Sequence, residues 1–227
     1  MNAAIIVAAG KGLRMADPLR KQYLELEGLP ILARTVAVFD ACDLIDVIFL
    51  VIPREDSDYC RANVLDPLSL TKSIHLVSGG IRRQDSVYKG LSEIDQRYQI
   101  IVIHDGVRPF LNSDHLVDCI ESAKKFGACI LGVPAYDTLK RVDSSGRILQ
   151  TLPRENVWLA QTPQAFQYDV IKKAHDNARR DGYTATDDAS LVERMGEKVK
   201  IINGSRNNIK ITRPEDLEIA KYLLRIS

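Results

Sequence analysis

Short apolar runs recur along the chain and alternate with longer segments in which apolar and polar residues are mixed. The apolar runs occupy residues 3–7, 47–52, 74–77, 100–103, 128–133 and 199–202. Several of them are rich in Val and Ile, which is typical of strands buried on both faces of a parallel sheet. The pattern therefore predicts a strand over each run.

The segments between the runs carry apolar residues at helical spacing. They predict helices over residues 31–42, 83–93, 113–126, 168–180 and 214–224, a helical stretch after residue 52, and a helix that begins at residues 186–188. Polar residues at several of these starts suit helix caps, with Ser113-Asp114 and Thr186 or Asp187 as candidates. Strands that alternate with helices predict a Rossmann-like α/β fold: a doubly wound, mostly parallel sheet in a single domain spanning residues 1–227.

Residues 137–154 interrupt this alternation. Two short extended runs flank a turn that contains Gly146, so the segment is predicted to form a β-hairpin. The hairpin has little apolar surface of its own, which leaves two interpretations open: a loose surface excursion, or an arm that packs on a second subunit. Residues 161–166 are predicted to form a loop before the next helix.

Composition narrows the class of protein. The 227 residues carry 31 basic and 30 acidic side chains, a net charge of +1, so no overall positive field favours nucleic acid as a partner. The four cysteines have no paired short spacing, and reduced packing thiols are expected rather than zinc ligands or disulfides. No stretch approaches the roughly 20 apolar residues of a membrane span. These features predict a cytoplasmic enzyme with no membrane partner.

The loop after the first predicted strand is the first candidate for chemistry. Residues 8–15 read Ala-Ala-Gly-Lys-Gly-Leu-Arg-Met, in which Gly10 and Gly12 permit a tight turn whose amide groups face a ligand. Arg14 lies in the same loop, and Lys21 follows it. Exposed amides beside positive charge suit a polyphosphate, so a nucleoside triphosphate site is one hypothesis, and a glycine turn without a ligand is the other.

Two common phosphate-binding loops do not fit these residues. A Walker A loop requires Lys-Ser or Lys-Thr straight after its last glycine, and Leu13 follows Gly12 here. A dinucleotide fingerprint requires a third glycine at position 15, where this chain has Met15.

Polar clusters also follow two other predicted strands. They consist of Gly79, Gly80, Arg83 and Ser86 after residues 74–77, and of His104, Asp105 and Arg108 after residues 100–103. Ligands of doubly wound sheets lie beyond the carboxyl ends of the strands. Clusters that share one sheet edge therefore predict a single anion-binding site. His104 is interpreted as a structural, hydrogen-bonded residue.

These motifs form one ordered series with several later ones. The series consists of Ala8-Ala9-Gly10 with Gly12, Arg14 and Met15; Lys21-Gln22-Tyr23-Leu24; Gly79-Gly80 with Arg83 and Ser86-Val87; His104-Asp105 with Arg108-Pro109; Asp137-Thr138; Thr162-Pro163-Gln164; Thr186-Asp187 with Ala189-Ser190; and Asn208-Ile209-Lys210-Ile211-Thr212 with Pro214-Glu215-Asp216. The opening loop alone is shared with the wider class of sugar nucleotidyltransferases. The full series resembles the 2-C-methyl-D-erythritol 4-phosphate cytidylyltransferase family of the non-mevalonate isoprenoid route over nearly the whole chain.

The resemblance implies a reaction in which CTP and 2-C-methyl-D-erythritol 4-phosphate give 4-diphosphocytidyl-2-C-methyl-D-erythritol and pyrophosphate. The acceptor's phosphate oxygen attacks the α-phosphorus in line, so no covalent enzyme intermediate is expected. The resemblance also implies a nucleotidyltransferase fold, Mg²⁺ or another divalent cation, and a homodimer in which the arm of residues 137–154 reaches the second subunit.

The resemblance also implies roles for individual residues. Arg14 and Lys21 match the stabilisers of the transition state at the α-phosphate, and Arg154 and Lys210 match the pair that holds the acceptor. The triphosphate cradle matches Ala8, Ala9, Gly10 and Gly12, and the cytidine site matches Gly80, Asp85 and Ser86. Asp105 matches a position near the phosphates, where it holds Mg²⁺ or orients the acceptor. The further acceptor-side positions are Arg108, Thr138, Thr162 and Thr186.

The chain departs from the family's pattern at three positions, of which Gly106, in place of the small residue usual beside Asp105, should be tolerated. Arg20 replaces the proline that usually precedes Lys21, which predicts a more mobile segment there, and Ile81 replaces a polar or acidic residue at the nucleotide site. Residues 107–110 also occur in the sister ribitol-phosphate cytidylyltransferases, so ribitol 5-phosphate is an alternative acceptor. A non-catalytic module that only binds CTP is the remaining alternative.

Overall fold

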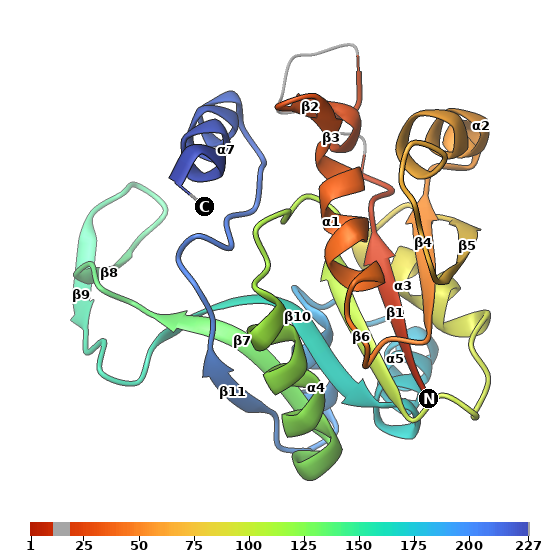
Figure 1. Ribbon diagram of the computed structural model, residues 1–227. Coiled ribbons are helices and arrows are strands. Elements are labelled where there is room, and N and C mark those ends of the chain that lie inside the picture. Colours follow the sequence, from red (N-terminus) through yellow and green to blue (C-terminus); the bar gives the residue numbers. More distant parts are fainter. Residues whose placement is uncertain (11–18, 227) are drawn as a thin grey trace.

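The computed structural model describes residues 1–10 and 19–226, and a seven-stranded sheet forms its centre (Figure 1). The strands lie in the order β11-β7-β10-β6-β1-β4-β5. Their bounds are Asn2–Val7 (β1), Val47–Ile52 (β4), Ser73–Ser78 (β5), Ile100–Asp105 (β6), Ala128–Pro134 (β7), Trp158–Gln167 (β10) and Lys200–Asn203 (β11). All the predicted apolar runs form strands of this sheet.

The pairing of the strands is mostly parallel. Strands β1, β4, β5 and β6 are parallel to their neighbours within this group, and β7 is parallel to β11, whereas β10 is antiparallel to both β6 and β7. The prediction of a loop over residues 161–166 is wrong, because these residues lie within β10. The pairing of β10 with β7 is irregular between Ala160 and Gln164, where Pro163 has no N–H to donate.

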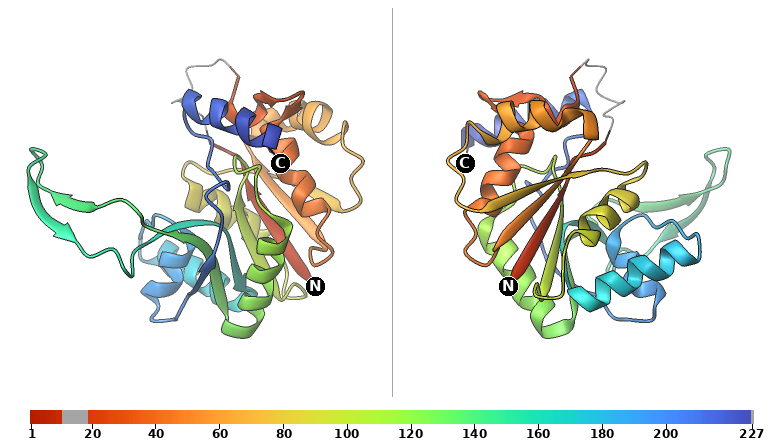
Figure 2. Two further views of the ribbon diagram at one scale, coloured as in Figure 1. Left: turned by 60° about the vertical axis from the view of Figure 1, so that its left-hand side comes forward. Right: turned by 90° about the vertical axis from the view of Figure 1, so that its right-hand side faces the viewer.

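Helices cover both faces of the sheet (Figure 1 and Figure 2). Helices α1 (Ile31–Asp40) and α4 (Ser113–Phe126) pack on one face, and α3 (Arg83–Ser92), α5 (Tyr168–Arg180) and α6 (Asp188–Arg194) pack on the other. Successive residues of β1 point to opposite faces, so Ala4 and Ile6 join the first core and Ala3 and Ile5 join the second. The doubly wound architecture is therefore confirmed.

Local capping chemistry sets where two of the helices begin. The side chain of Asn112 accepts the backbone N–H of Asp114 at 2.7 Å, so the cap of α4 lies one residue before the predicted Ser113-Asp114. The side chain of Asp187 accepts the N–H of Ser190 at 3.0 Å, which makes Asp187 the cap of α6, as predicted.

Smaller elements surround the carboxyl ends of the central strands. The predicted helical stretch after β4 consists of η2 (Arg54–Asp56), α2 (Ser57–Cys60) and η3 (Arg61–Leu65). A two-residue hairpin, β2 (Glu25–Leu26) and β3 (Leu29–Pro30), was not predicted. Helix α7 (Pro214–Ile226) packs on it, because Ala220 joins Leu26 in a small buried cluster.

An antiparallel hairpin extends away from the sheet and its helices (Figure 2). It consists of β8 (Leu139–Val142) and β9 (Ile148–Leu152), and Gly146 turns between them at a φ of 82°. The predicted hairpin is therefore confirmed. We call residues 137–154 the arm. Val142, Ile148 and Leu149 of the arm are exposed, so the fold of this chain leaves them uncovered.

The four cysteines, Cys42, Cys60, Cys119 and Cys129, lie in the interior as free thiols, as the sequence predicts. Within the described ranges, the structure contains no helix whose length and apolar character would let it cross a lipid bilayer.

Candidate active site

A pocket of about 250 Å³ lies where the loops after β1, β5 and β6 meet. The predicted site residues that line it are Ala8, Ala9, Gly10, Lys21, Gly80, Ser86, Asp105 and Lys210. The sheet edge thus brings together clusters that are far apart in the sequence, as the position of ligands in doubly wound sheets predicts.

Close packing joins the loop after β1 to the loop after β5. A Cβ atom on Gly79 would lie 2.2 Å from the Cβ of Ala9, so only glycine permits this approach. Gln22 is buried, and its Nε2 donates to the carbonyl oxygen of Ala8 at 2.8 Å. The Oγ of Ser86 accepts the N–H of Gly80 at 3.0 Å. The first wall of the pocket is therefore built from backbone held in place by small side chains.

Lys21 reaches the pocket from the short helix η1 (Lys21–Tyr23). The preceding Arg20 forms ion pairs with Glu55 at 2.5 Å and with Asp56 at 2.9 Å. These contacts tie the start of η1 to the helical stretch after β4. Arg20 thus supplies an anchor at the position where the family usually has proline, and the greater mobility expected for this segment stays a prediction.

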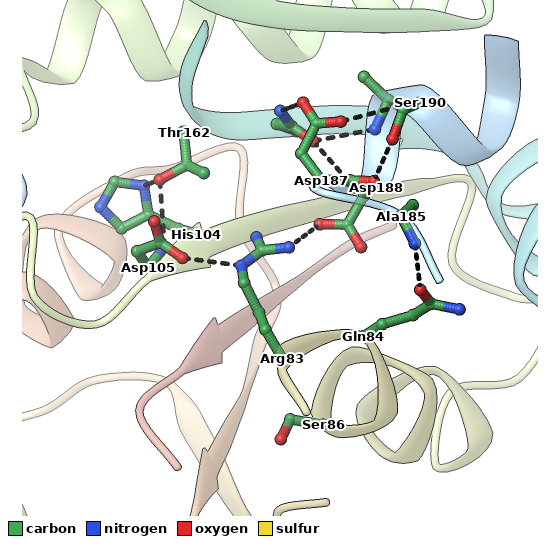
Figure 3. A network of polar contacts seen from close by, with 12 residues as sticks. Arg83, Gln84, Ser86, His104, Asp105, Thr162, Ala185, Asp187, Asp188 and Ser190 are labelled. Atoms are coloured by element: carbon green, nitrogen blue, oxygen red, sulfur yellow. Dashed lines mark hydrogen bonds and ion pairs between the residues drawn. The ribbon is translucent and has the colours of Figure 1, made fainter. Parts of the chain in front are cut away.

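Asp105, at the carboxyl end of β6, is the centre of an ion-pair network (Figure 3). Its Oδ1 lies 2.9 Å from Arg83 Nε, and its Oδ2 lies 2.8 Å from Lys210 Nζ and 3.5 Å from Arg108 Nε. The carboxylate is buried, and the cations around it outnumber its single negative charge. This surplus of positive charge in a partly desolvated pocket suits an anionic ligand.

The same contacts shift the pKa values of the network. Burial raises the pKa of Asp105, but Arg83, Lys210 and Arg108 together bring it well below its ordinary value, so the carboxylate is ionised. Burial lowers the pKa of Arg83, yet Asp188 and Asp105 bring it above its ordinary value. Asp105 and Arg83 therefore both stay charged near neutral pH.

His104 and Thr162 hold Asp105 from the buried side. Thr162 Oγ1 accepts the backbone N–H of Asp105 at 3.1 Å and lies 3.0 Å from Nδ1 of His104. Nε2 of His104 lies 3.1 Å from the carbonyl oxygen of Arg108. Burial lowers the pKa of His104 to about 4, so the ring is neutral and donates from Nε2. The structural interpretation of His104 agrees with this geometry, and Thr162, expected on the acceptor side, lies buried behind Asp105.

Lys210 reaches the pocket because the segment after β11 is anchored at Asn208. The side chain of Asn208 is buried, and its Nδ2 donates to the carbonyl oxygen of Thr162 at 2.8 Å. Arg108 Nη1 donates to the carbonyl oxygen of Asn208 at 2.6 Å. Arg108 therefore bridges the Lys210 segment and Asp105, and it does not itself line the pocket.

Two candidate residues of the nucleotide and acceptor sites lie beside the pocket. Asp85 forms an ion pair with Arg82 at 2.9 Å and faces a neighbouring pocket of about 400 Å³ between α3 and α5. Thr186 directly precedes the α6 cap Asp187 and is absent from the described lining of the site.

The two candidates on the arm are not brought to the pocket by the fold of their own chain. Arg154 and Thr138 belong to the arm, and the Arg154 guanidinium donates to the carbonyl oxygen of Tyr136. Neither residue lines the pocket. Arg14 and Gly12 fall within residues 11–18, outside the part of the chain that the structure describes.

One ion pair behind the pocket was not predicted as part of the site. Arg83 lies between two acids, because its Nη1 is 2.7 Å from Oδ2 of Asp188 while its Nε contacts Asp105 (Figure 3). Gln164 holds Asp188 by accepting its backbone N–H at 3.1 Å. Arg83 and Gln164 both belong to the motif series, but no sequence signal paired them with Asp188, since the partners lie far apart along the chain.

The side chains of the described pocket offer few ligands for a divalent cation. In the described ranges, no group of three His, Cys, Asp or Glu residues could hold a metal ion. Asp105 supplies the carboxylate among the described residues that line the pocket. Mg²⁺ typically needs one or two carboxylates, with water and substrate phosphates completing its shell, so Asp105 together with a bound triphosphate fits such an ion.

The chain matches known proteins over its whole length. The family model for 2-C-methyl-D-erythritol 4-phosphate cytidylyltransferase matches residues 2–226. Relatives of that name are 44% identical in Alkaliphilus oremlandii, covering 99% of this chain and 95% of the relative, and 46% identical in Geotalea uraniireducens, covering 98% and 96%.

Solved structures agree with these matches. The 4-diphosphocytidyl-2C-methyl-D-erythritol synthase of Anaerococcus prevotii has a TM-score of 0.87 at 34% identity and covers 98% of this chain and 95% of its own. The 2-C-methyl-D-erythritol 4-phosphate cytidylyltransferase of Thermus thermophilus has a TM-score of 0.80 at 29% identity, with coverages of 99% and 100%. This chain therefore belongs to the 2-C-methyl-D-erythritol 4-phosphate cytidylyltransferase family and is a cytidylyltransferase.

Proposed function

We propose that this enzyme transfers CMP from CTP to 2-C-methyl-D-erythritol 4-phosphate and releases pyrophosphate. The observation that carries the proposal is that Ala8–Gly10, Lys21, Asp105 and Lys210 line one pocket. Backbone amides and two ammonium groups from different walls are suited to a triphosphate and a second phosphate that must be brought into contact.

The transfer proceeds by direct displacement. A phosphate oxygen of the acceptor forms a bond to the α-phosphorus of CTP, the bond from that phosphorus to the bridging oxygen breaks, and pyrophosphate leaves with the electron pair. The amides of Ala8–Gly10 hold the triphosphate, Lys21 stabilises charge at the α-phosphate, and Lys210 holds the acceptor phosphate. Arg14 shares the role of Lys21. Positioning and charge stabilisation suffice, so no nucleophilic side chain is needed.

Gly80 and Ser86, in the wall formed by the loops after β1 and β5, bind the cytidine moiety, with Asp85 beside them. Asp105 orients the acceptor, Arg108 and Thr162 hold Asp105 in place, and a direct acceptor contact of Thr186 stays a prediction. Asp105 would hold a divalent cation that binds together with CTP, and that ion would neutralise charge on the phosphates. Calorimetric titration of Mg²⁺ with and without CTP tests whether the cation binds only together with the nucleotide. We expect Mg²⁺ binding in the presence of CTP and none in its absence.

The arm reaches a second copy of the chain in this proposal. Arg154 and Thr138 lie on the arm and away from the pocket of their own chain, while the arm exposes Val142 and Ile148. A homodimer accounts for both facts, because it covers the apolar side chains and brings Arg154 and Thr138 to the partner's acceptor site. The expected cytoplasmic location remains a prediction.

The experiment that tests the function is pyrophosphate release with CTP and Mg²⁺, measured with 2-C-methyl-D-erythritol 4-phosphate, with ribitol 5-phosphate and without acceptor. Release with the first acceptor alone is expected, and the ratio of kcat/KM values for the two acceptors decides between them. A preference for ribitol 5-phosphate would reassign the acceptor. CTP binding without release from any mixture would contradict transfer altogether.

A further inference from the structure

His175 lies at the far end of the network that begins in the pocket. It is a residue of α5, it is 1% exposed, and its Nε2 lies 3.1 Å from Oδ1 of Asp188. The other oxygen of Asp188 contacts Arg83 at 2.7 Å, and Arg83 contacts Oδ1 of Asp105 at 2.9 Å. A continuous line of charged and polar side chains therefore connects α5 with the catalytic pocket.

The hydrogen-bond accounting shows what His175 contributes. Asp188 is buried and only accepts hydrogen bonds, so the contact requires a hydrogen on Nε2 of His175. Nδ1 of His175 is buried and has no hydrogen-bond partner among the described residues, which agrees with the hydrogen being on Nε2. Without His175, one oxygen of a buried carboxylate loses its donor, and the carboxylate is free to turn toward Arg83 with both oxygens.

The two oxygens of Asp105 have different partners, and this is why rotation of the Asp188 carboxylate would affect Lys210. Oδ1 of Asp105 contacts Arg83, whereas Oδ2 contacts Lys210 at 2.8 Å. Arg83 contacts Asp105 through Nε and Asp188 through Nη1, so the orientation of Asp188 sets the plane of the guanidinium. If Arg83 rotates, Asp105 rotates with it, and the ammonium group of Lys210 loses its fixed position.

We propose that His175 is a positioning residue for the transfer reaction: it orients Asp188, which holds Arg83 on one oxygen of Asp105 and leaves the other oxygen for Lys210. The proposal rests on the role of Lys210 in the proposed function. His175 does not line the pocket of Asp105 and Lys210 but the neighbouring pocket between α3 and α5, and its contact with that site runs through Asp188.

The first experiment compares His175→Leu with His175→Gln. Leucine removes the donor, whereas the amide nitrogen of glutamine donates from nearly the place of Nε2. We expect kcat/KM for the acceptor to fall about 10-fold in His175→Leu, as a small displacement of catalytic groups requires, with KM for CTP unchanged. His175→Gln should recover most of the loss. Equal activity of His175→Leu and the wild-type enzyme would overturn the proposal, as would failure of the glutamine to recover any activity.

A control separates positioning from general stability. Asp40 is a buried acid at the end of α1 that accepts the N–H groups of Thr71 and Lys72, far from the pocket. Asp40→Asn should lower stability with unchanged kcat/KM per folded molecule. If that variant loses activity as His175→Leu does at matched folded fraction, a specific role for His175 is contradicted.

A double-mutant cycle tests whether His175 acts through Asp188. We expect the double variant His175→Leu, Asp188→Asn to be no less active than Asp188→Asn alone, because both changes break the same line of contacts. Losses that multiply would show that His175 acts elsewhere. A crystal structure of His175→Leu gives a readout that does not depend on activity: Lys210 should leave Oδ2 of Asp105, and an unchanged ion pair would contradict the proposal even if the acceptor had been assigned wrongly.

Discussion

Lys210 Nζ lies 2.8 Å from Oδ2 of Asp105, which joins the segment after β11 to the end of β6. This ion pair places an ammonium group of a late segment in a pocket built from the first half of the chain. The carboxylate is buried and remains ionised, so the ammonium group is held in place before any substrate arrives. Such preorganisation is what stabilisation of a highly anionic transition state requires.

Replacing Lys210 by alanine should lower kcat/KM for the acceptor by about 10²–10³-fold, as the loss of one preorganised charge-stabilising group does. Steady-state pyrophosphate release measures the change. Lys221→Ala is the matched control, because Lys221 lies on α7 and pairs with Glu218 at the surface. Equal losses in both variants would argue against a specific role for Lys210.

Lys21→Ala should lower kcat by about 10²–10³-fold for the same physical reason, with unchanged circular dichroism. Lys173→Ala on α5 removes an exposed lysine away from the pocket and should leave kcat unchanged. Arg20→Ala breaks the ion pairs with Glu55 and Asp56 and should reduce kcat less than Lys21→Ala. Full activity of Lys21→Ala would remove Lys21 from the mechanism.

Arg83→Leu should destabilise the fold by ~3–5 kcal/mol, because it leaves the carboxylates of Asp105 and Asp188 buried without their shared cation. Urea unfolding followed by circular dichroism gives the free energy of unfolding. Arg82→Leu is the neighbouring control: its ion pair with Asp85 is exposed, so a clearly smaller loss is expected. Similar losses in the two variants would contradict the buried network as a source of stability.

Stability should fall as the pH falls from 6.5 to about 4, since the pKa of His104 is lowered from its ordinary value of 6.5 to about 4 by burial. In this window the unfolded chain binds a proton that the folded protein excludes, so acid favours unfolding, by up to about 1.4 kcal/mol per pH unit. His104→Asn should flatten the dependence of the unfolding free energy on pH between these values. An unchanged slope in that variant would show that other groups cause it.

The homodimer predicts that two inactive variants complement each other. Lys210→Ala and Arg154→Ala, unfolded together and refolded, should form mixed dimers in which one site combines an intact Lys210 with the partner subunit's Arg154. Random pairing then returns about a quarter of wild-type activity, because half of the dimers are mixed and each has one complete site. Each variant refolded alone is the control. If mixed dimers form without activity, Arg154 does not act across the interface.

Local patterns were sufficient for most of the fold. Continuous apolar runs predicted every strand of the sheet except β10. Residues 161–166 of β10 contain Pro163 and polar side chains, which favoured a loop, and their pairing with β7 is irregular. The short hairpin of β2 and β3 was missed because two-residue strands carry no periodicity. Asn112 as the α4 cap was missed by one residue, within the usual uncertainty of helix ends.

The sequence by itself determined the doubly wound class, the family and the residue types of the pocket, because strand and helix periods and ordered motifs are local properties of the chain. Only the tertiary structure decided how these residues act together. It placed Arg83 between Asp105 and Asp188, and it put Arg154 outside the pocket of its own chain. Contacts between residues far apart along the chain depend on packing of the sheet and its helices, which no local pattern encodes.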